Sequence, residues 1–119
     1  MPHLVLEYSS NLALEVQPTL LRLNQALVAS GHFEENAIKS RAVRREDYLV
    51  GTQPQARRAF LHLRLAILTG RTLEEKKQVA DILGAAVQKE QRWPQDTQVQ
   101  VTVDVVDMQR ETYFKLSLP

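Results

Sequence analysis

The most distinctive chemistry available to this chain is that of Pro2, which directly follows the initial methionine. Within a chain a proline nitrogen is an amide, but at the start of a chain it is a secondary amine with a basic lone pair. A small residue in second place generally permits removal of the methionine, so we expect Pro2 to carry a free amine. Burial and nearby cations would lower the pKa of this amine toward neutrality, where it can accept and return a proton. A Met-Pro start without chemical function is the commoner situation, so the hypothesis needs support from other residues.

Three cations are candidates for binding an anionic substrate, namely Arg71, Lys39 and Arg41. Lys39 and Arg41 are two residues apart, so they share one face if residues 37–44 form a strand. Arginine can pair with a carboxylate through two parallel hydrogen bonds, whereas lysine offers a point charge. The alternative is structural. Lys39 and Arg41 would then lie on a solvated strand face, and Arg71 would lie beside a helix start, where a cation is slightly unfavourable.

Composition argues against several other kinds of chemistry. The chain has 119 residues, no cysteine and a formal net charge of +1, so we expect no disulfide and no general attraction to nucleic acid. The histidines His3, His32 and His62 lack metal-ligand spacing, and no phosphate loop or nucleophile motif is present, so neither a metal nor a cofactor is expected. The start does not resemble a signal peptide and no apolar run could cross a membrane, so we expect a cytoplasmic protein without membrane contact.

The elements that must position these residues follow from the hydrophobic periodicity. Strands are predicted at residues 3–8, 37–44, 59–68 and from 98 to about 105, with residues 46–58 as a connection. A first helix is indicated by Leu20, Leu23 and Leu27, with Pro18 in its first turn and Gly31 as its stop. A second helix begins with a capping box between Thr72 and Glu75 and continues to about Gln91. Residues 113–118 are predicted as a short strand or an arm, and residues 11–17 stay undecided.

The order strand–helix–strand occurs twice, which indicates a single α+β domain over residues 1–119 with an internal duplication. The predicted fold is a duplicated β-α-β subunit, with a four-stranded mixed sheet and two helices on one face. We expect the other face of the sheet to be apolar and to be covered by a neighbouring subunit.

Four segments, in the same order along the chain, carry a resemblance to a known family. They are MPHLVLEYSSNL at residues 1–12, AIKSRAV at 37–43, AFLHLRLAILTGRTLEEKKQ at 59–78 and YFK at 113–115. Together they resemble the 5-carboxymethyl-2-hydroxymuconate isomerases of the tautomerase superfamily. The stretch LTGRT at residues 68–72, followed by acidic residues, also resembles the Gly-Arg-Ser step of the 4-oxalocrotonate tautomerases.

The resemblance implies a homotrimer, an amino-terminal proline as general base, cations that bind substrate carboxylates, and no metal or organic cofactor. Pro2 and Arg71 match family positions, while Lys39 stands where the family often has arginine, so Lys39 or Arg41 would fill the second cationic role. The implied reaction is keto–enol isomerisation of a small carboxylated dienol such as 5-carboxymethyl-2-hydroxymuconate. Two alternatives stay open. One is another reaction of the superfamily, such as phenylpyruvate tautomerisation or dehalogenation, and the other is a noncatalytic homotrimeric binding or scaffold protein.

Overall fold

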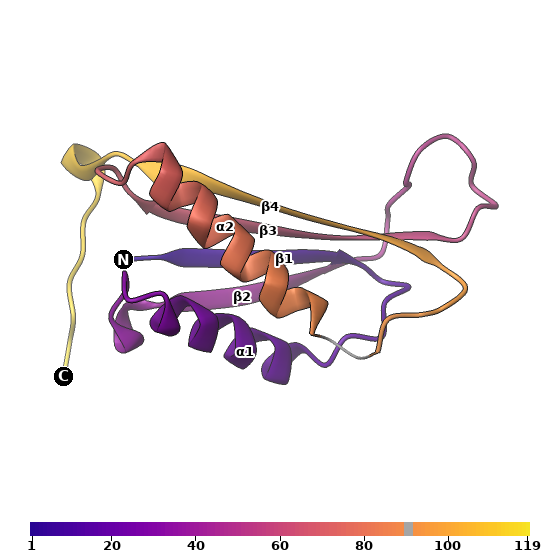
Figure 1. The fold of residues 1–119 in the computed structure, drawn as a ribbon, viewed down its shortest axis with the longest axis horizontal. Helices are drawn as coiled ribbons and strands as arrows, with labels where there is room; N and C mark the ends of the chain where they lie inside the picture. The colour runs from indigo at the N-terminus through magenta and orange to yellow at the C-terminus, as the bar shows by residue number, and fades with distance from the viewer. Residues whose placement is uncertain (90–91) are drawn as a thin grey trace.

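The computed structural model describes residues 1–89 and 92–119, and its centre is a four-stranded mixed sheet (Figure 1). The strands are β1 (His3–Ser9), β2 (Lys39–Arg45), β3 (Arg58–Leu68) and β4 (Gln98–Met108), in the spatial order β2-β1-β3-β4. β1 is parallel to β2 and β3 is parallel to β4, while the central strands β1 and β3 are antiparallel. Each half of the chain therefore forms one β-α-β unit, as predicted, and the two units join through their first strands.

Two helices cover one face of this sheet, α1 (Val16–Ala29) and α2 (Leu73–Gln88) (Figure 1). α1 ends just before Gly31, whose φ of 82° is the left-handed conformation that commonly terminates helices. α2 begins with the predicted capping box, in which the Glu75 amide donates to Thr72 Oγ1 (3.1 Å) and the Thr72 amide donates to Glu75 Oε1 (3.0 Å). Gly31 and the capping box at Thr72 therefore bound the two helices where the sequence predicted, and both act through the backbone.

The core lies between the helices and the sheet. Because side chains alternate along a strand, every second residue of the central strands is fully buried on this side: Leu4, Leu6, Leu61, Leu63 and Leu65. Leucines of both helices complete the core. Pro2 has the same parity as Leu4, and less than 2% of its side chain is exposed, so the start of the chain is packed on the core side.

The opposite face of the sheet is not apolar, and the expectation that it would be is wrong. It carries polar side chains that are paired with one another: Arg45 with Glu7, Arg64 and His62 with Asp104, and His62 with Thr102. Two of these pairs, His62 with Thr102 and Arg64 with Asp104, are directly opposite in the β3–β4 register. Cross-strand pairs of this kind stabilise a face that contacts water. The strand register creates the pairs, so single-strand periodicity does not reveal them.

Several boundaries differ from the prediction. Ala37 belongs to a 3-10 turn (Glu35–Ala37), and β2 begins only at Lys39. After β4 a second 3-10 turn (Arg110–Thr112) leads into residues 113–119, which form no strand and run as an arm past the amino terminus (Figure 1). The predicted end of the second helix near Gln91 lies outside the described residues. Neither α-helix in the described part of the chain is long and apolar enough to cross a membrane.

Candidate active site

A cavity of about 290 Å³ lies at the end of the sheet where the chain begins. Its lining comes from four parts of the chain, residues 1, 32–37, 67–71 and 110: Met1, His32, Phe33, Glu34, Ala37, Ile67, Leu68, Arg71 and Arg110. Pro2 is buried at this end, and its carbonyl accepts a hydrogen bond from the Lys39 amide (3.1 Å), which fixes the chain start against β2. The fold thus brings the amino terminus and Arg71, which are far apart in sequence, to the same cavity.

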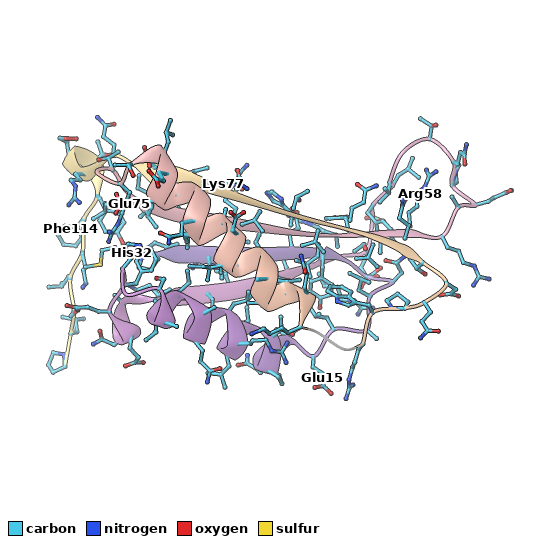
Figure 2. All side chains as sticks on the ribbon, in the orientation of Figure 1. Glu15, His32, Arg58, Glu75, Lys77 and Phe114 are labelled. Carbon is cyan, nitrogen blue, oxygen red and sulfur yellow. The ribbon has the colours of Figure 1, made fainter. Side chains whose placement is uncertain are left out.

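Arg71 directly precedes Thr72, the N-cap residue of α2, and is held from several sides. Its Nη2 donates to the His32 carbonyl oxygen (2.8 Å), its Nη1 donates to His32 Nδ1 (3.0 Å), and Glu75 Oε2 lies 3.6 Å from Nη1. The guanidinium carbon also lies 5.6 Å from the centre of the Phe33 ring, within cation–π distance. Figure 2 shows His32 and Glu75 together at this end of the molecule. Arg71 therefore joins the turn after α1 to the start of α2 and is half-buried and oriented.

The amino group at the chain start lies in a cationic environment. Burial is the main cause that holds the pKa of the Met1 amino group below its ordinary value. Nearby positive charges act in the same direction, in decreasing order Lys39, Lys115, Arg110 and Arg71. Both effects disfavour the ammonium form, because a charged amine loses hydration on burial and is repelled by other cations. The site therefore favours a neutral, proton-accepting amine.

The two other predicted cations, Lys39 and Arg41, do not line this cavity. Lys39 Nζ donates to the Ala37 carbonyl (2.8 Å), and Lys39 borders a neighbouring hollow of about 270 Å³ that includes Tyr113 and Lys115 of the carboxy-terminal arm. Arg41 lies on the open face of the sheet, where its Nη2 donates to His3 Nδ1 (3.4 Å). Lys39 is therefore close to the amino terminus, whereas Arg41 contacts the residue after Pro2.

The three histidines have separate environments. His32 contacts Arg71, and His62 contacts Thr102 and Asp104 on the open face. His3 accepts from Arg41 at Nδ1, so Nε2 carries the proton that it donates to the hydroxyl of Tyr113 (2.9 Å). Burial and then the charges of Arg41 and Lys39 hold the pKa of His3 below its ordinary value. In the described part of the chain, no group of three or more His, Cys, Asp or Glu side chains could hold a metal ion.

Sequence reasoning did not identify Arg110, Phe33 or the contact between His32 and Arg71. A signal for Arg110 was nevertheless available. Arg71 follows the end of β3 and Arg110 follows the end of β4, and these two strands are parallel, so their ends lie at the same edge of the sheet. The turn that carries His32 and Phe33 had no such signal, because its placement depends on how α1 packs against the sheet.

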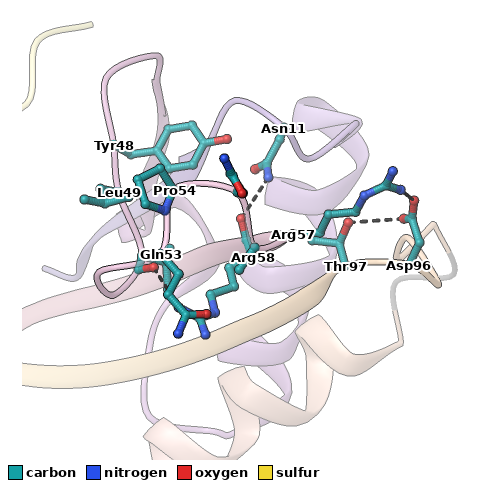
Figure 3. A pocket seen from close by; sticks show the side chains of 12 residues that line it. Asn11, Tyr48, Leu49, Gln53, Pro54, Arg57, Arg58, Asp96 and Thr97 are labelled. Carbon is teal, nitrogen blue, oxygen red and sulfur yellow. Dashed lines mark hydrogen bonds and ion pairs between the residues drawn. The ribbon is translucent and has the colours of Figure 1, made fainter.

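A larger cavity of about 620 Å³ lies at the opposite end of the sheet, around the connection between β2 and β3 (Figure 3). Its charged groups are engaged with their surroundings. Arg57 is paired with Asp96, Arg58 Nη1 donates to the Val50 carbonyl (3.3 Å), and Asn11 Nδ2 donates to the Arg58 carbonyl (2.9 Å). Size alone does not make this cavity the better candidate, because the chain start lies at the other end of the sheet (Figure 1), where Met1 and Arg71 line the smaller cavity.

Comparisons with solved structures agree with this architecture. A 5-carboxymethyl-2-hydroxymuconate isomerase from Deinococcus radiodurans R1 is 29% identical, with a TM-score of 0.81 over 98% of this chain and 90% of that chain. A 5-carboxymethyl-2-hydroxymuconate delta-isomerase is 18% identical, with a TM-score of 0.75 over 100% and 89%. A fused 4-OT, described as a wild-type symmetric trimer, is 20% identical, with a TM-score of 0.67 over 92% and 87%. The last two show a likeness in fold alone. A search of curated protein sequences found no match.

The four-stranded mixed sheet with two helices on one face defines an α+β fold of the tautomerase type. The sequence profile of one family, 5-carboxymethyl-2-hydroxymuconate isomerase, matches residues 2–117. The chain belongs to the 5-carboxymethyl-2-hydroxymuconate isomerase family. It is therefore an isomerase of the tautomerase superfamily, as the resemblance in sequence predicted.

Proposed function

We propose that this chain is a keto–enol isomerase that needs no added cofactor and uses the amine of Pro2, freed by removal of Met1, as its general base. The observation that carries the proposal is the cavity at the chain start, which Met1 shares with Arg71 beside the buried Pro2. The substrate class is a small dienol or α-keto acid with one or more carboxylates. Within this class, 5-carboxymethyl-2-hydroxymuconate is the first substrate to test, because the family bears its name.

In this mechanism a single proton is moved and none is consumed. The neutral amine takes the proton of the 2-hydroxyl group and becomes an ammonium. The electron pair left on oxygen forms the carbonyl, the conjugated double bond shifts, and the ammonium returns its proton to a distant carbon. Arg71, helped by Lys39 or Arg41, orients a carboxylate and balances the negative charge that develops on oxygen.

The electrostatics of the site support this role for the amine. A general base is most effective when its pKa is close to the working pH. Burial and four surrounding cations hold the pKa of the Met1 amine low, and the amine of Pro2 would occupy the same end of β1 after Met1 is removed. The same cations would attract a carboxylated substrate, so one arrangement serves both proton transfer and binding.

The proposal extends to assembly and location. The likeness in fold to a 4-OT described as a symmetric trimer supports a homotrimer. The open face of the sheet, which neither α-helix of the described residues covers, is the surface that a neighbouring subunit would use. We place the protein in the cytoplasm, where small carboxylated intermediates of aromatic-acid breakdown would be available.

The test is to block the nitrogen of Pro2 without changing any side chain. Insertion of one alanine between Met1 and Pro2 gives a chain in which the Pro2 nitrogen is an amide after methionine removal, and intact-mass measurement verifies each amino terminus. We expect turnover of the enol, followed by ultraviolet absorbance, to fall roughly 10²- to 10⁴-fold, which is the usual contribution of a general base. Pro2→Ala is the second variant. It retains a terminal amine of a different kind, so we expect a large loss there too.

The control is the circular-dichroism spectrum and melting temperature, which should change little because the insertion lies before β1. Full activity of the inserted chain on a verified dienol would remove Pro2 from the mechanism.

A further inference from the structure

His32 differs from the other two histidines of the chain in having a ring nitrogen without a partner. Both ring nitrogens of His3 and both of His62 contact polar side chains. His32 contacts Arg71 through Nδ1, whereas its Nε2 has no hydrogen-bond or ion-pair partner in the described part of the chain. Because His32 also lines the cavity at the chain start, Nε2 is the ring nitrogen that a ligand there could contact.

Arg71 determines which nitrogen of His32 carries the proton. A guanidinium has only N–H donors, so Arg71 Nη1 donates and His32 Nδ1 accepts, over a distance of 3.0 Å. A neutral imidazole that accepts at Nδ1 carries its proton on Nε2. The nitrogen without a partner is therefore a hydrogen-bond donor. The positive charge beside Nδ1 polarises the ring, which strengthens donation from Nε2.

The imidazole ring of His32 is also held in place. Arg71 Nη2 donates to the His32 carbonyl oxygen (2.8 Å), so one guanidinium binds both the backbone and the side chain of the same residue. The Phe33 ring packs edge-on against the His32 ring, with 6.2 Å between the ring centres and an angle of 70° between the ring planes. A donor that is already oriented needs little reorganisation when negative charge develops on its acceptor.

The contact with Arg71 also indicates which ligand atom this donor would reach. In the proposed function Arg71 binds a carboxylate. In a 2-hydroxy or 2-keto acid, the oxygen on C2 is carried by the carbon next to that carboxylate. Nδ1 and Nε2 belong to the same small ring, so the Nε2 donor is close to the Arg71 guanidinium. A carboxylate bound to Arg71 would therefore bring the oxygen on C2 close to His32.

We propose that His32 is a catalytic residue, whose neutral imidazole donates a hydrogen bond from Nε2 to the oxygen on C2 of the substrate. This inference rests on the proposed function for the reaction and deepens it by naming the group that binds the reacting oxygen. As the amine of Pro2 takes the hydroxyl proton, negative charge develops on this oxygen and the hydrogen bond strengthens. His32 keeps its own proton, and its contribution is larger in the transition state than in the bound enol.

The first experiment uses two probes that cannot be turned over. Trimethylpyruvate is a 2-keto acid that cannot enolise, because its C3 carries no hydrogen, and 3,3-dimethylbutanoate has a methylene group in place of the keto group. Their dissociation constants are measured by calorimetry on the full chain for the unmodified protein, His32→Asn and His32→Gln. Asparagine can place an oxygen near the position of Nδ1, which keeps an acceptor for Arg71 without the Nε2 donor. Glutamine can place an amide N–H near the position of Nε2.

We expect the unmodified protein to prefer trimethylpyruvate by roughly 3- to 10-fold, the effect of one hydrogen bond between neutral groups. His32→Asn should lose this preference, with binding of 3,3-dimethylbutanoate changed less than about twofold, and His32→Gln should keep part of it. The inference is overturned if the unmodified protein shows no preference or if His32→Asn retains it. Equal weakening of both probes in His32→Asn would also overturn it, because His32 would then act only by positioning Arg71.

The second experiment is steady-state turnover of a verified dienol. A hydrogen bond to a charged oxygen is stronger than one to a neutral oxygen, so kcat should fall about 10- to 100-fold in His32→Asn while KM changes less than about twofold. His32→Gln should recover part of the loss, and an unchanged kcat in His32→Asn would overturn the catalytic role. If the preference for the keto probe depends on His32 but the unmodified protein turns over no dienol, the proposed function is contradicted and the hydrogen bond to the oxygen on C2 is confirmed.

Discussion

At the scale of single residues, the candidate site combines side chains that the protein orients with side chains that it leaves available. Arg71 is fixed by His32, Glu75 and Phe33, so it has a structural role in joining two turns in addition to any contact with substrate. Both roles must be separated by experiment, because loss of the side chain removes both. A lysine at the same position keeps the charge and removes the fork, which makes it the informative comparison.

The first prediction at this scale concerns Arg71. Arg71→Ala should lower kcat/KM for a carboxylated dienol roughly 10- to 100-fold, because a charge-assisted hydrogen bond to the substrate is lost. The kcat/KM of Arg71→Lys should lie between those of the unmodified protein and Arg71→Ala. The measurement is steady-state ultraviolet kinetics with enough substrate concentrations to separate kcat from KM. Unchanged values of both parameters in Arg71→Ala would reject a substrate contact for this residue.

The second prediction distinguishes Lys39 from Arg41. Lys39 is the cation that contributes most to the low pKa of the amino-terminal amine, and Arg41 is not among the cations that contribute. In the proposed mechanism the base must be neutral to act, so activity should rise with pH as the Pro2 amine loses its proton. Removing Lys39 raises the pKa of the amine. The acidic limb of the kcat/KM profile should therefore move to higher pH in Lys39→Gln and stay in place in Arg41→Gln. A shift in Arg41→Gln but not in Lys39→Gln would contradict this prediction, because Arg41 would then be the cation that lowers the pKa of the amine.

At the scale of elements, the sequence predicted both β-α-β units because each depends on signals within one segment. The alternation of apolar and polar residues predicted the central strands. The capping box at Thr72 predicted the start of α2, because the two amides that it satisfies, those of Thr72 and Glu75, lie within four residues of each other. The start of β2 was placed too early, because Ala37 is apolar and buried but lies in a turn. The site was only partly predictable. Arg71 and Pro2 had motifs around them, whereas His32, Phe33 and Arg110 come together through packing and strand pairing.

The prediction at this scale concerns the capping box that follows Arg71. Thr72→Ala should lower the free energy of unfolding by about 1 kcal/mol, because an amide at the start of α2 loses its partner. Urea denaturation followed by circular dichroism measures the change. The matched control is Thr52→Ala in the exposed connection between β2 and β3, where we expect a change within about 0.5 kcal/mol. Equal effects of both substitutions would show that the cap does not stabilise the helix.

At the scale of the whole molecule, the proposed homotrimer depends on the open face of the sheet. The face was expected to be apolar, but it carries paired charges with apolar residues between them. A mixed face of this kind can contact another subunit only if its polar groups keep partners, since a buried charge without a partner is costly. The pairs Glu7–Arg45 and Asp104–Arg64 already supply partners within one subunit.

The corresponding prediction is the mass of the native particle. Light scattering coupled to size-exclusion chromatography should give about 41 kDa, three times the 13.6 kDa of one chain, as expected for a closed homotrimer. Arg45→Glu places two like charges side by side on the open face and should shift the particle toward the monomer. A mass near that of one chain for the unmodified protein at micromolar concentration would contradict the trimer.

Because Met1 and Arg110 line one cavity and the arm that follows passes the amino terminus, both ends of the chain are poor places for an affinity tag or a fluorophore. The connection between β2 and β3 is the better attachment point, since it is exposed and lies at the far end of the sheet. The chain has no cysteine. A single Gln55→Cys substitution would therefore provide one thiol for selective labelling, and a dye there would report on tumbling or surface immobilisation without touching the cavity at the chain start.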